Sequence, residues 1–422
     1  MARYIAKRIR FRNGERLSVL TVAHGLPVHE ATLYLDSFRR KGRAANTIHF
    51  VCCTLALLYR ELDRTGINLM DRLGEGRFLA APDLGRLASL AQLRMADMDE
   101  DGAEEIKPKS NVINMARISL RLKTEQGQRV PVDVGTQASR LRYMADFLAF
   151  VAGYAAATLP AEKRTRLEHE SAQALEAFRA QIPPVSKRAK LDARIGLSSE
   201  EQDRLVRVVH PDSPDNPWSR GFVRRRNWLI VVLLLATGMR RGELLGLQIK
   251  DLNPREPKLR IIRRADAAED SRTVQPNTKT NDREIELKPS ILKALWQHIN
   301  EDRRSIRAAR KIPQIFVSDE GEALSGASID KLFVQLRNAC PGLPVSLASH
   351  VMRHTWNERF SEQADALGLS DVEEQQARNQ QQGWSENSKS AATYTRRHTA
   401  KKGNEISLKL QERLDEKLQH EN

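Results

Sequence analysis

The chain has 422 residues, of which 40% are hydrophobic and 29% are charged, so it can build two or three domains with cores of their own. Its formal net charge of +15 favours an anionic partner, most often a nucleic acid and less often an anionic membrane surface. The longest apolar run, 228–239, is about half as long as a membrane span and is flanked by arginines, so we expect a buried core helix there.

The first 23 residues are predicted to form a basic hairpin or arm. Residues 8–22 alternate apolar and polar side chains around Asn13-Gly14, a pattern typical of a β-hairpin. Several basic residues precede this turn without the apolar segment of a signal peptide behind them, so no signal peptide is expected. These basic residues are Arg3, Lys7, Arg8, Arg10 and Arg12.

Residues 24–182 are predicted to form a helical domain. Thr47 can cap a helix whose apolar residues recur at helical spacing from Ile48 to Leu62. An acidic segment rich in turn residues, 97–108, interrupts this pattern, and another helix is predicted to begin near Thr136. No repeat of regular period is present.

A change of composition at 183–196 predicts a linker, because Pro183-Pro184 is followed by a run of basic residues. Ser198 and Glu201 have the spacing of a helix capping box, so a second domain is predicted over 197–400. A helix over 224–246 is followed by strand-like stretches at 259–263 and 283–287, by further helices and by an amphipathic tail over 401–422. The predicted fold class is mainly α with a small β-sheet.

The three cysteines are Cys52, Cys53 and Cys340. Their spacing fits neither a disulfide framework nor a zinc site, so a reducing cytoplasm is the expected compartment.

Two short segments of the second domain contain residues that could hold a phosphate. Residues 236–247 read ATGMRRGELLGL, in which Arg240 follows a glycine and Glu243 lies three positions later. Residues 350–354 read HVMRH, so His350 and Arg353 share one face of a helix. A guanidinium presents a planar fork to two non-bridging phosphate oxygens, which lysine does less well. The two arginines are therefore candidates for a phosphate clamp.

Cutting a phosphodiester bond without a metal or ATP requires a nucleophile, cations near the phosphorus and an acid for the leaving oxygen. A tyrosine nucleophile keeps the bond energy in a covalent link until the strand is resealed. The chain has six tyrosines, and Tyr394 is the only one from residue 197 onward. If the second domain uses a tyrosine, it must be this one.

The ordered set of an arginine, a His-x-x-Arg motif, a histidine or tryptophan and a tyrosine resembles the signature of the tyrosine recombinases, the phage integrase family. The resemblance covers roughly 197–400. It implies that Arg240 and Arg353 clamp the scissile phosphate and that Tyr394 is the nucleophile. It further implies that His350 assists proton transfer or bonds a phosphate oxygen, with Glu243 in a supporting role.

The family also has a general-acid lysine in a β-hairpin loop, and Lys279 in the segment TKTNDREIEL matches that place. Trp384 stands where most members have a histidine; its indole N–H donates one hydrogen bond but cannot shuttle a proton. Ten residues separate Trp384 from Tyr394, about one more than is usual in the family. Other interpretations stay open: Lys279 could be a solvated loop residue, Trp384 a core residue, and Glu243 one half of a solvated helix pair.

The resemblance implies a fold in which a helical core-binding domain grips the other face of DNA, so that both domains form a C-shaped clamp. Residues 33–50, LYLDSFRRKGRAANTIHF, resemble the opening of that helical domain. Basic residues here and in the linker suit contact with the DNA backbone. A linker that is only a solvated spacer could have the same composition. These residues are Arg39, Arg40, Lys41 and Arg43, with Lys187, Arg188 and Lys190 in the linker.

The tail places Ile406, Leu410, Leu414 and Leu418 on one stripe. It could pack on its own domain or, as the resemblance implies, dock on a neighbouring protomer.

The resemblance therefore implies a site-specific DNA recombinase that works through a 3′-phosphotyrosyl link and a Holliday junction, without a metal or nucleotide cofactor. Its expected partner is double-stranded DNA with specific recombination sites, bound by a dimer at each site and by a tetramer at synapsis, near the bacterial nucleoid. One alternative is a topoisomerase IB-like enzyme that relaxes supercoils without exchanging strands. Another is a DNA-binding regulator that has lost catalysis. The DNA target, and the choice among integration, excision, transposition and resolution, are not encoded in a readable way.

Overall fold

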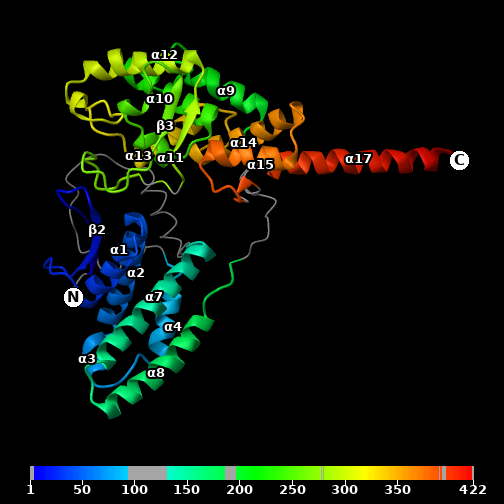
Figure 1. Cartoon of the computed structure of the whole chain (residues 1–422). Coiled ribbons are helices and arrows are strands. Elements are labelled where there is room, and N and C mark those ends of the chain that lie inside the picture. Colours follow the sequence, from blue (N-terminus) through cyan, green and yellow to red (C-terminus); the bar gives the residue numbers. More distant parts are fainter. Residues whose placement is uncertain are drawn as a thin grey trace. The chain divides into compact units, whose positions relative to one another are not determined.

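The computed structural model describes residues 4–93, 131–185, 196–276, 278, 280–388, 390–391 and 396–420 (Figure 1). It divides into two compact units. The first comprises Met1–Phe11 and Arg16–Arg188, and the second comprises Arg12–Glu15 and Ala189–Asn422. The interruption at 97–108 lies outside the described residues, as does most of the linker. Each unit is considered by itself below.

The first unit begins with a β-hairpin. Strands β1 (Ile5–Arg10) and β2 (Arg16–Thr21) pair in antiparallel fashion, with Ile5 opposite Thr21 and Arg10 opposite Arg16. The chain turns at Asn13-Gly14, where Gly14 has a φ of +92° and the Asn13 side chain accepts a hydrogen bond from the Glu15 N–H at 3.1 Å. The hairpin thus forms around the dipeptide that predicted it, and β1 starts three residues earlier than expected.

Six helices complete the described part of the first unit, and their apolar faces share one core. Leu55, Leu58 and Phe147 are among its fully buried side chains. The prediction that Thr47 caps a helix is wrong, because the helix begins at Ala45 with Ala44 as the capping residue. Asp133 caps the later helix by accepting from the Thr136 N–H at 2.9 Å. The helices are α1 (His29–Arg40), α2 (Ala45–Arg64), α3 (Leu69–Gly74), α4 (Ala81–Leu90), α7 (Val134–Ala156) and α8 (Ala161–Ala180).

The second unit opens with the predicted capping box. The Ser198 side chain accepts from the Glu201 N–H at 3.2 Å, and the Glu201 carboxylate accepts from the Ser198 N–H at 2.7 Å. The helix predicted over 224–246 is in fact two helices, because Gly238 adopts a left-handed φ of +60° and ends the first of them. The first helices are α9 (Ser199–Val209), α10 (Gly221–Thr237) and α11 (Arg241–Gly246).

In the described residues, a two-stranded antiparallel sheet and five more α-helices follow. Strand β3 (Lys258–Ile261) pairs with β4 (Arg283–Glu286), close to the two predicted strands. The apolar face of α10 is buried in the core of this unit, and no helix of the described residues is both long and apolar enough to cross a membrane. The fold class is therefore confirmed as mainly α with small sheets. The later helices are α12 (Pro289–Gln297), α13 (Gly326–Ala339), α14 (Ser349–Ala366), α15 (Asp371–Gln382) and α17 (Arg396–His420).

Candidate active site

The break between α10 and α11 determines where Arg240 lies. Gly238 ends α10 in the left-handed conformation, and Arg240 becomes the residue that caps α11. A Cβ on Gly238 would lie 2.8 Å from the Trp356 ring and 2.9 Å from Gln382 Nε2, so both the conformation and the space require glycine. The turn thus takes Arg240 off the apolar helix and places it at the start of the next one.

Arg240 lies beside Glu243, and part of its guanidinium has no hydrogen-bonded partner. Its backbone N–H donates to Glu243 Oε2 at 2.9 Å, and its Nη1 lies 3.7 Å from Glu243 Oε1. Nη1 is buried yet donates no hydrogen bond to any described residue, while the side chain is 33% exposed. Arg240 therefore keeps donors available for an anion that approaches from solvent.

Glu243 is the centre of a buried network. Its carboxylate accepts from Thr280 Oγ1 at 2.5 Å and from Arg283 Nη2 at 2.8 Å. Burial by itself would raise the pKa of Glu243. The hydrogen bonds and the charge of Arg283, together with the hydrogen bonds from the Thr280 hydroxyl and the Arg240 backbone N–H, outweigh burial and hold this pKa below its usual value. Glu243 is thus a buried, ionised group that ties α11 to β4, and not part of a solvated helix pair.

Arg353 is anchored to the same turn from α14. Its Nη1 donates to the carbonyl oxygen of Gly238 at 2.7 Å, and only 3% of the residue is exposed. Its guanidinium carbon lies 5.1 Å from the centre of the Trp384 ring, within cation–π distance. A single turn of backbone therefore links Arg353 to Arg240, which lies two residues after Gly238.

Trp384 follows α15 and lies against the segment before β4. Gly383 ends α15 with a φ of +63°, and its carbonyl accepts from the Asn281 N–H at 2.8 Å. A Cβ on Gly383 would lie 2.8 Å from the Asn281 carbonyl oxygen, so this close approach also requires glycine. Trp384 itself is 8% exposed, and packing against Arg353 accounts for part of that burial.

His350 occupies the second position of α14, one turn before Arg353, and is partly exposed. Its ring lies edge-on to that of His354, with the ring centres 6.4 Å apart. The structure therefore places Arg240 in contact with Glu243 and Arg353 in contact with Trp384, and it links the two arginines through the turn at Gly238. His350 lies on the helix that carries Arg353.

Residues 197–396 match the model of the phage integrase family. This segment belongs to that family. The chain is also similar to three solved structures. The XerH site-specific recombinase bound to a palindromic difH substrate is 16% identical, with a TM-score of 0.44, and the match covers 82% of this chain and 97% of that one. For the Tn1549 transposon integrase in complex with circular intermediate DNA, the identity is 15%, the TM-score 0.40 and the coverage 81% of this chain and 94% of that one. For the XerA recombinase, the identity is 16%, the TM-score 0.35 and the coverage 87% of this chain and 92% of that one. No curated protein matches the chain.

Residues 197–396 of the second unit thus form a phage integrase domain. Two predicted residues of this site, Lys279 and Tyr394, lie outside the described residues. Thr278 and Thr280, on either side of Lys279, are both buried, and Thr280 is bonded to Glu243.

The basic residues predicted to contact DNA lie at the end of α1 and beyond it. Arg39 and Arg40 are exposed and pair with Asp36 at 3.5 and 2.7 Å, while Lys41 and Arg43 are exposed in the connection to α2. Lys187, Arg188 and Lys190 lie outside the described residues.

Sequence reasoning missed Arg283 and Gln382 in the phage integrase domain. Arg283 bonds Glu243 and also donates to the Gln381 carbonyl at 2.7 Å, while Gln382 Nε2 donates to the Thr237 carbonyl at 3.2 Å. Both side chains hold the end of α15 against other elements of the site. The sequence does contain one indication for Arg283: an arginine within a strand pattern can be paired with a buried acidic residue.

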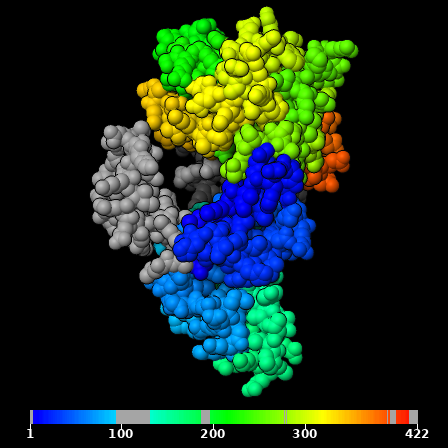
Figure 2. All heavy atoms as spheres, turned by 90° about the vertical axis from the view of Figure 1, so that its left-hand side faces the viewer, coloured from blue at the N-terminus to red at the C-terminus, as the bar shows by residue number. Residues whose placement is uncertain are grey.

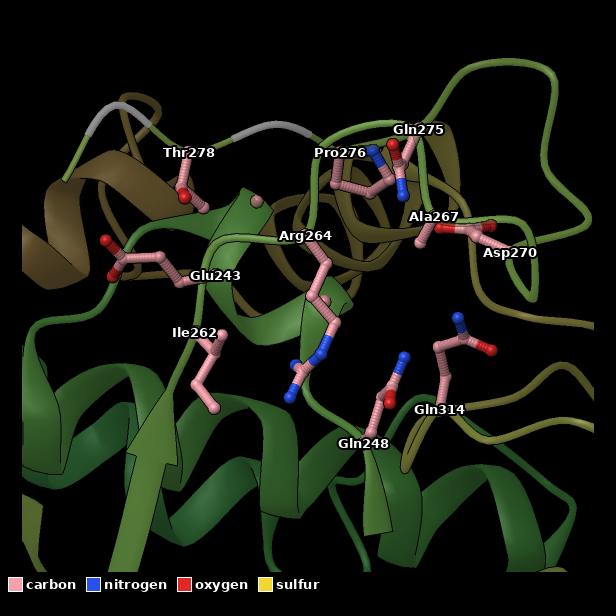
Figure 3. A pocket seen from close by; sticks show the side chains of 12 residues that line it. Glu243, Gln248, Ile262, Arg264, Ala267, Asp270, Gln275, Pro276, Thr278 and Gln314 are labelled. Atoms are coloured by element: carbon pink, nitrogen blue, oxygen red, sulfur yellow. The ribbon is translucent and has the colours of Figure 1, made fainter. Parts of the chain in front are cut away.

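Glu243 also lines a small pocket, together with Gln248, Arg264 and Gln314 (Figure 3). Its volume is about 20 Å³, enough for one water molecule. Gln248 and Gln314 are each 2% exposed, and the Oε1 atom of each accepts no hydrogen bond from any described residue. Arg264, on the same wall, is bonded to buried Asp251 at 2.9 Å. This pocket is too small for a nucleotide and supports the site structurally.

Proposed function

We propose that this chain is a site-specific DNA recombinase in which Tyr394 cuts one strand and holds it covalently. The observation that carries the proposal is the joining of Arg240 and Arg353 through Gly238, inside a phage integrase domain. Two preorganised guanidinium groups can hold the charge that develops on a phosphate under attack. The substrate is double-stranded DNA that carries specific recombination sites.

The reaction begins when the Tyr394 oxygen attacks the scissile phosphorus. A tyrosine–phosphorus bond forms as the bond to the 5′ oxygen breaks, which leaves a 3′-phosphotyrosyl link and a free 5′ hydroxyl. Lys279 protonates the departing oxygen, and His350 bonds a phosphate oxygen or assists the proton transfer. Attack by the 5′ hydroxyl of the partner strand reverses these steps and produces a Holliday junction, which a second round resolves.

The described residues have distinct roles in this scheme. Arg353 is rigid because it is buried, bonded to Gly238 and stacked on Trp384, so it defines where the phosphate lies. Arg240 is more exposed and completes the clamp when the phosphate arrives. Glu243 is a positioning residue that keeps Arg240, β4 and α11 together. The scheme needs neither a metal ion nor ATP, because the guanidinium groups supply the positive charge and the phosphotyrosine conserves the bond energy.

The first unit would bind the opposite face of the DNA, and basic residues of α1 and of the linker would contact the backbone. Two protomers would occupy each site and four would form the synapse, in the cytoplasm at the nucleoid. Helix α17 would dock on a neighbouring protomer, since Ile406, Leu408 and Leu410 are all more than half exposed along it. Figure 1 shows this helix extending beyond α14 and α15. His398 and Lys402 fix its first turns to Asp365 at 2.8 and 2.6 Å.

A nicked suicide substrate tests the proposal. Wild-type protein should form a covalent adduct in the presence of a metal chelator and without ATP. Tyr394→Phe should bind the same DNA and form no adduct, and an adduct in that variant would overturn the assignment. Relaxation of supercoils by dilute protein, without recombinant product, would instead identify a topoisomerase IB-like enzyme. Absence of any cleavage by the wild type would identify a DNA-binding regulator.

A further inference from the structure

A cavity of about 330 Å³ opens in the first unit between the hairpin and α2. Its wall is formed by one residue of β1, five of α2 (among them Phe50) and one of α7. The polar and charged members of this wall are Arg8, Asn46, His49, Cys53, Thr54 and Arg140. We call this cavity the Arg8 notch. None of its residues is among those that the sequence predicted to contact DNA, and the hairpin has no role in the proposed recombination reaction.

Contacts between the hairpin and α2 build the notch. Arg8 and Ser18 are opposite each other across the two strands. Arg8 Nη1 donates to Asn46 Oδ1 at 2.9 Å, and Ser18 Oγ lies 3.0 Å from His49 Nδ1. His49 Nε2 lies 3.5 Å from Cys53 Sγ, one turn further along α2. Asn46, His49 and Cys53 thus share one face of α2, and the hairpin covers part of it.

The notch holds two guanidinium charges and, among the residues described, no carboxylate in its wall. Arg8 is hydrogen-bonded to the neutral amide of Asn46 and forms no ion pair within the described part of the chain. Arg140 is 8% exposed and donates to the carbonyl oxygens of Ala91 and Leu93, at 3.1 and 2.6 Å. Burial lowers the pKa of both arginines, although the charge of Asp133 partly offsets this for Arg140. Both stay protonated at neutral pH, and no carboxylate in the wall of the notch, as described, pairs with them.

The other two titratable groups in the notch, His49 and Cys53, are neutral at physiological pH. Burial, with the charge of Arg8 added, lowers the pKa of His49 to about 4, so its ring is neutral at physiological pH. Burial likewise raises the pKa of the Cys53 thiol, against the lowering effect of the nearby arginines. Half-buried arginines without an acid gain most from a ligand that carries negative charge and several acceptor oxygens. Such a ligand would also accept from the Asn46 amide.

We propose that the Arg8 notch binds one backbone phosphate of the DNA on which this chain acts. The inference rests on the proposed function and adds a contact that fixes the position of the first unit on the duplex without reading its sequence. DNA is favoured over a free anion because positive charge continues along the chain on both sides of the notch. Lys7 is exposed on β1, and Lys41 and Arg43 are exposed just before α2. Figure 2 shows the hairpin and the elements after it open to solvent on one face of the first unit.

The salt dependence of DNA binding tests the contact. With the full chain carrying Tyr394→Phe, binding to a labelled duplex is measured by fluorescence anisotropy at several salt concentrations. Log affinity falls linearly with log salt concentration. Arg8→Gln should make this slope less steep by about one, to a similar extent for every DNA sequence. Arg8→Lys should keep the slope, which separates a lost charge from a misfolded unit. Arg166→Gln, which removes an exposed arginine paired with Glu170 on α8, is the matched control. An unchanged slope for Arg8→Gln would overturn the proposal.

Cys53 provides a second readout inside the notch. It is partly exposed, whereas Cys52 and Cys340 are buried, so alkylation by iodoacetamide at mildly alkaline pH can be followed on the peptide that contains it. Bound duplex DNA should slow this alkylation several-fold, and Arg8→Gln should weaken the protection. If DNA gives no protection, the proposal fails, and protection by inorganic phosphate alone would mean that the notch is a site for the free ion. Neither readout requires DNA cleavage. If the wild type forms no covalent adduct, the proposed recombinase function fails, but the proposed phosphate contact in the notch does not.

Discussion

The candidate active site of the second unit and the Arg8 notch of the first both contain buried or partly buried arginines, but the groups that surround these arginines differ. In the second unit, the ionised and buried Glu243 binds Arg283 and lies 3.7 Å from Arg240. In the notch, Arg8 and Arg140 contact only amide and carbonyl oxygens. The candidate active site thus contains its own counter-charge, whereas the wall of the notch, in the described residues, contains no carboxylate.

This difference matches what each site would have to do. A catalytic cation accelerates a reaction only if it is already in place when charge develops on the phosphate, so it needs an internal network that fixes it. A binding cation needs only a favourable ground-state interaction with the ligand. The buried carboxylate of Glu243 therefore fits a site that must hold its groups in place, and the wall of the notch, without a carboxylate, fits a site that binds an anion.

The largest expected effect is on the network around Glu243. Glu243→Gln keeps the shape but removes the charge, so it leaves the buried Arg283 uncompensated and should cost about 3–5 kcal/mol of unfolding free energy. Urea unfolding followed by tryptophan fluorescence measures this in the second unit, which contains every tryptophan of the chain: Trp218, Trp228, Trp296, Trp356 and Trp384.

Asp330→Asn is the control for Glu243→Gln. It breaks the exposed ion pair of Arg241 and should cost less than about 1 kcal/mol. Equal losses in the two variants would show that the buried network contributes nothing special.

The next effect concerns Arg353. Lysine cannot donate to the Gly238 carbonyl and also present a planar fork to a phosphate. Arg353→Lys should therefore slow adduct formation on the suicide substrate by about 10²–10³-fold at saturating DNA. Arg359→Lys, on the same helix and paired with Glu362, should leave the rate within a few-fold of wild type. A similar slowing in both variants would point to damage to α14 and not to loss of a clamp.

The ordered motif is enough to single out Arg240, His350 and Arg353 as candidate site residues, because the chemistry calls for those residue types in that order along the chain. The capping box at Ser198 was predictable for a local reason, since both of its hydrogen bonds join residues three apart. Expectations of this kind depend on chemistry or on neighbours in the sequence.

The break at Gly238 could not be predicted in this way. The apolar pattern continues through the glycine, and a helix tolerates glycine at a cost of only about 1 kcal/mol. What ends α10 is the close approach of Trp356, over a hundred residues away. The Glu243–Arg283 pair and the Arg8 notch have the same origin: each joins residues whose separation in the sequence gives no local signal.

Gly238 therefore supports the third prediction. Gly238→Ala must adopt a left-handed φ and push against Trp356, whereas Gly368→Ala, with a φ of +68°, has no atom within 4 Å of the new Cβ. The first variant should lose about 1–3 kcal/mol more unfolding free energy than the second. It should also slow adduct formation, because the Arg353 anchor moves with the turn. Equal stability losses would mean that the strained φ alone matters.

The smallest expected effect is on the pH dependence of stability at His49, which tests whether the charge of Arg8 acts on this ring. The pKa of His49 in the folded chain is about 4, below its ordinary value of 6.5, because of burial and the charge of Arg8. Between pH 6.5 and 4 the unfolded chain binds a proton that the folded chain refuses. Stability near α2 is therefore complete above pH 6.5 and falls as the pH drops towards 4, by an amount on the order of 2 kcal/mol.

Hydrogen exchange of α2 peptides across this pH range measures the loss, after correction for the intrinsic exchange rate. His49→Gln keeps hydrogen-bonding groups without titrating, so its α2 should lose less protection than that of wild type as the pH falls. Removal of the exposed His169 on α8 controls for the loss of a histidine elsewhere in the unit. Bound DNA should reduce the pH effect in wild type, because a phosphate beside Arg8 offsets the positive charge that keeps His49 neutral. An equal loss of protection in wild type and His49→Gln would mean that the loss does not come from the titration of His49, which burial and the charge of Arg8 oppose.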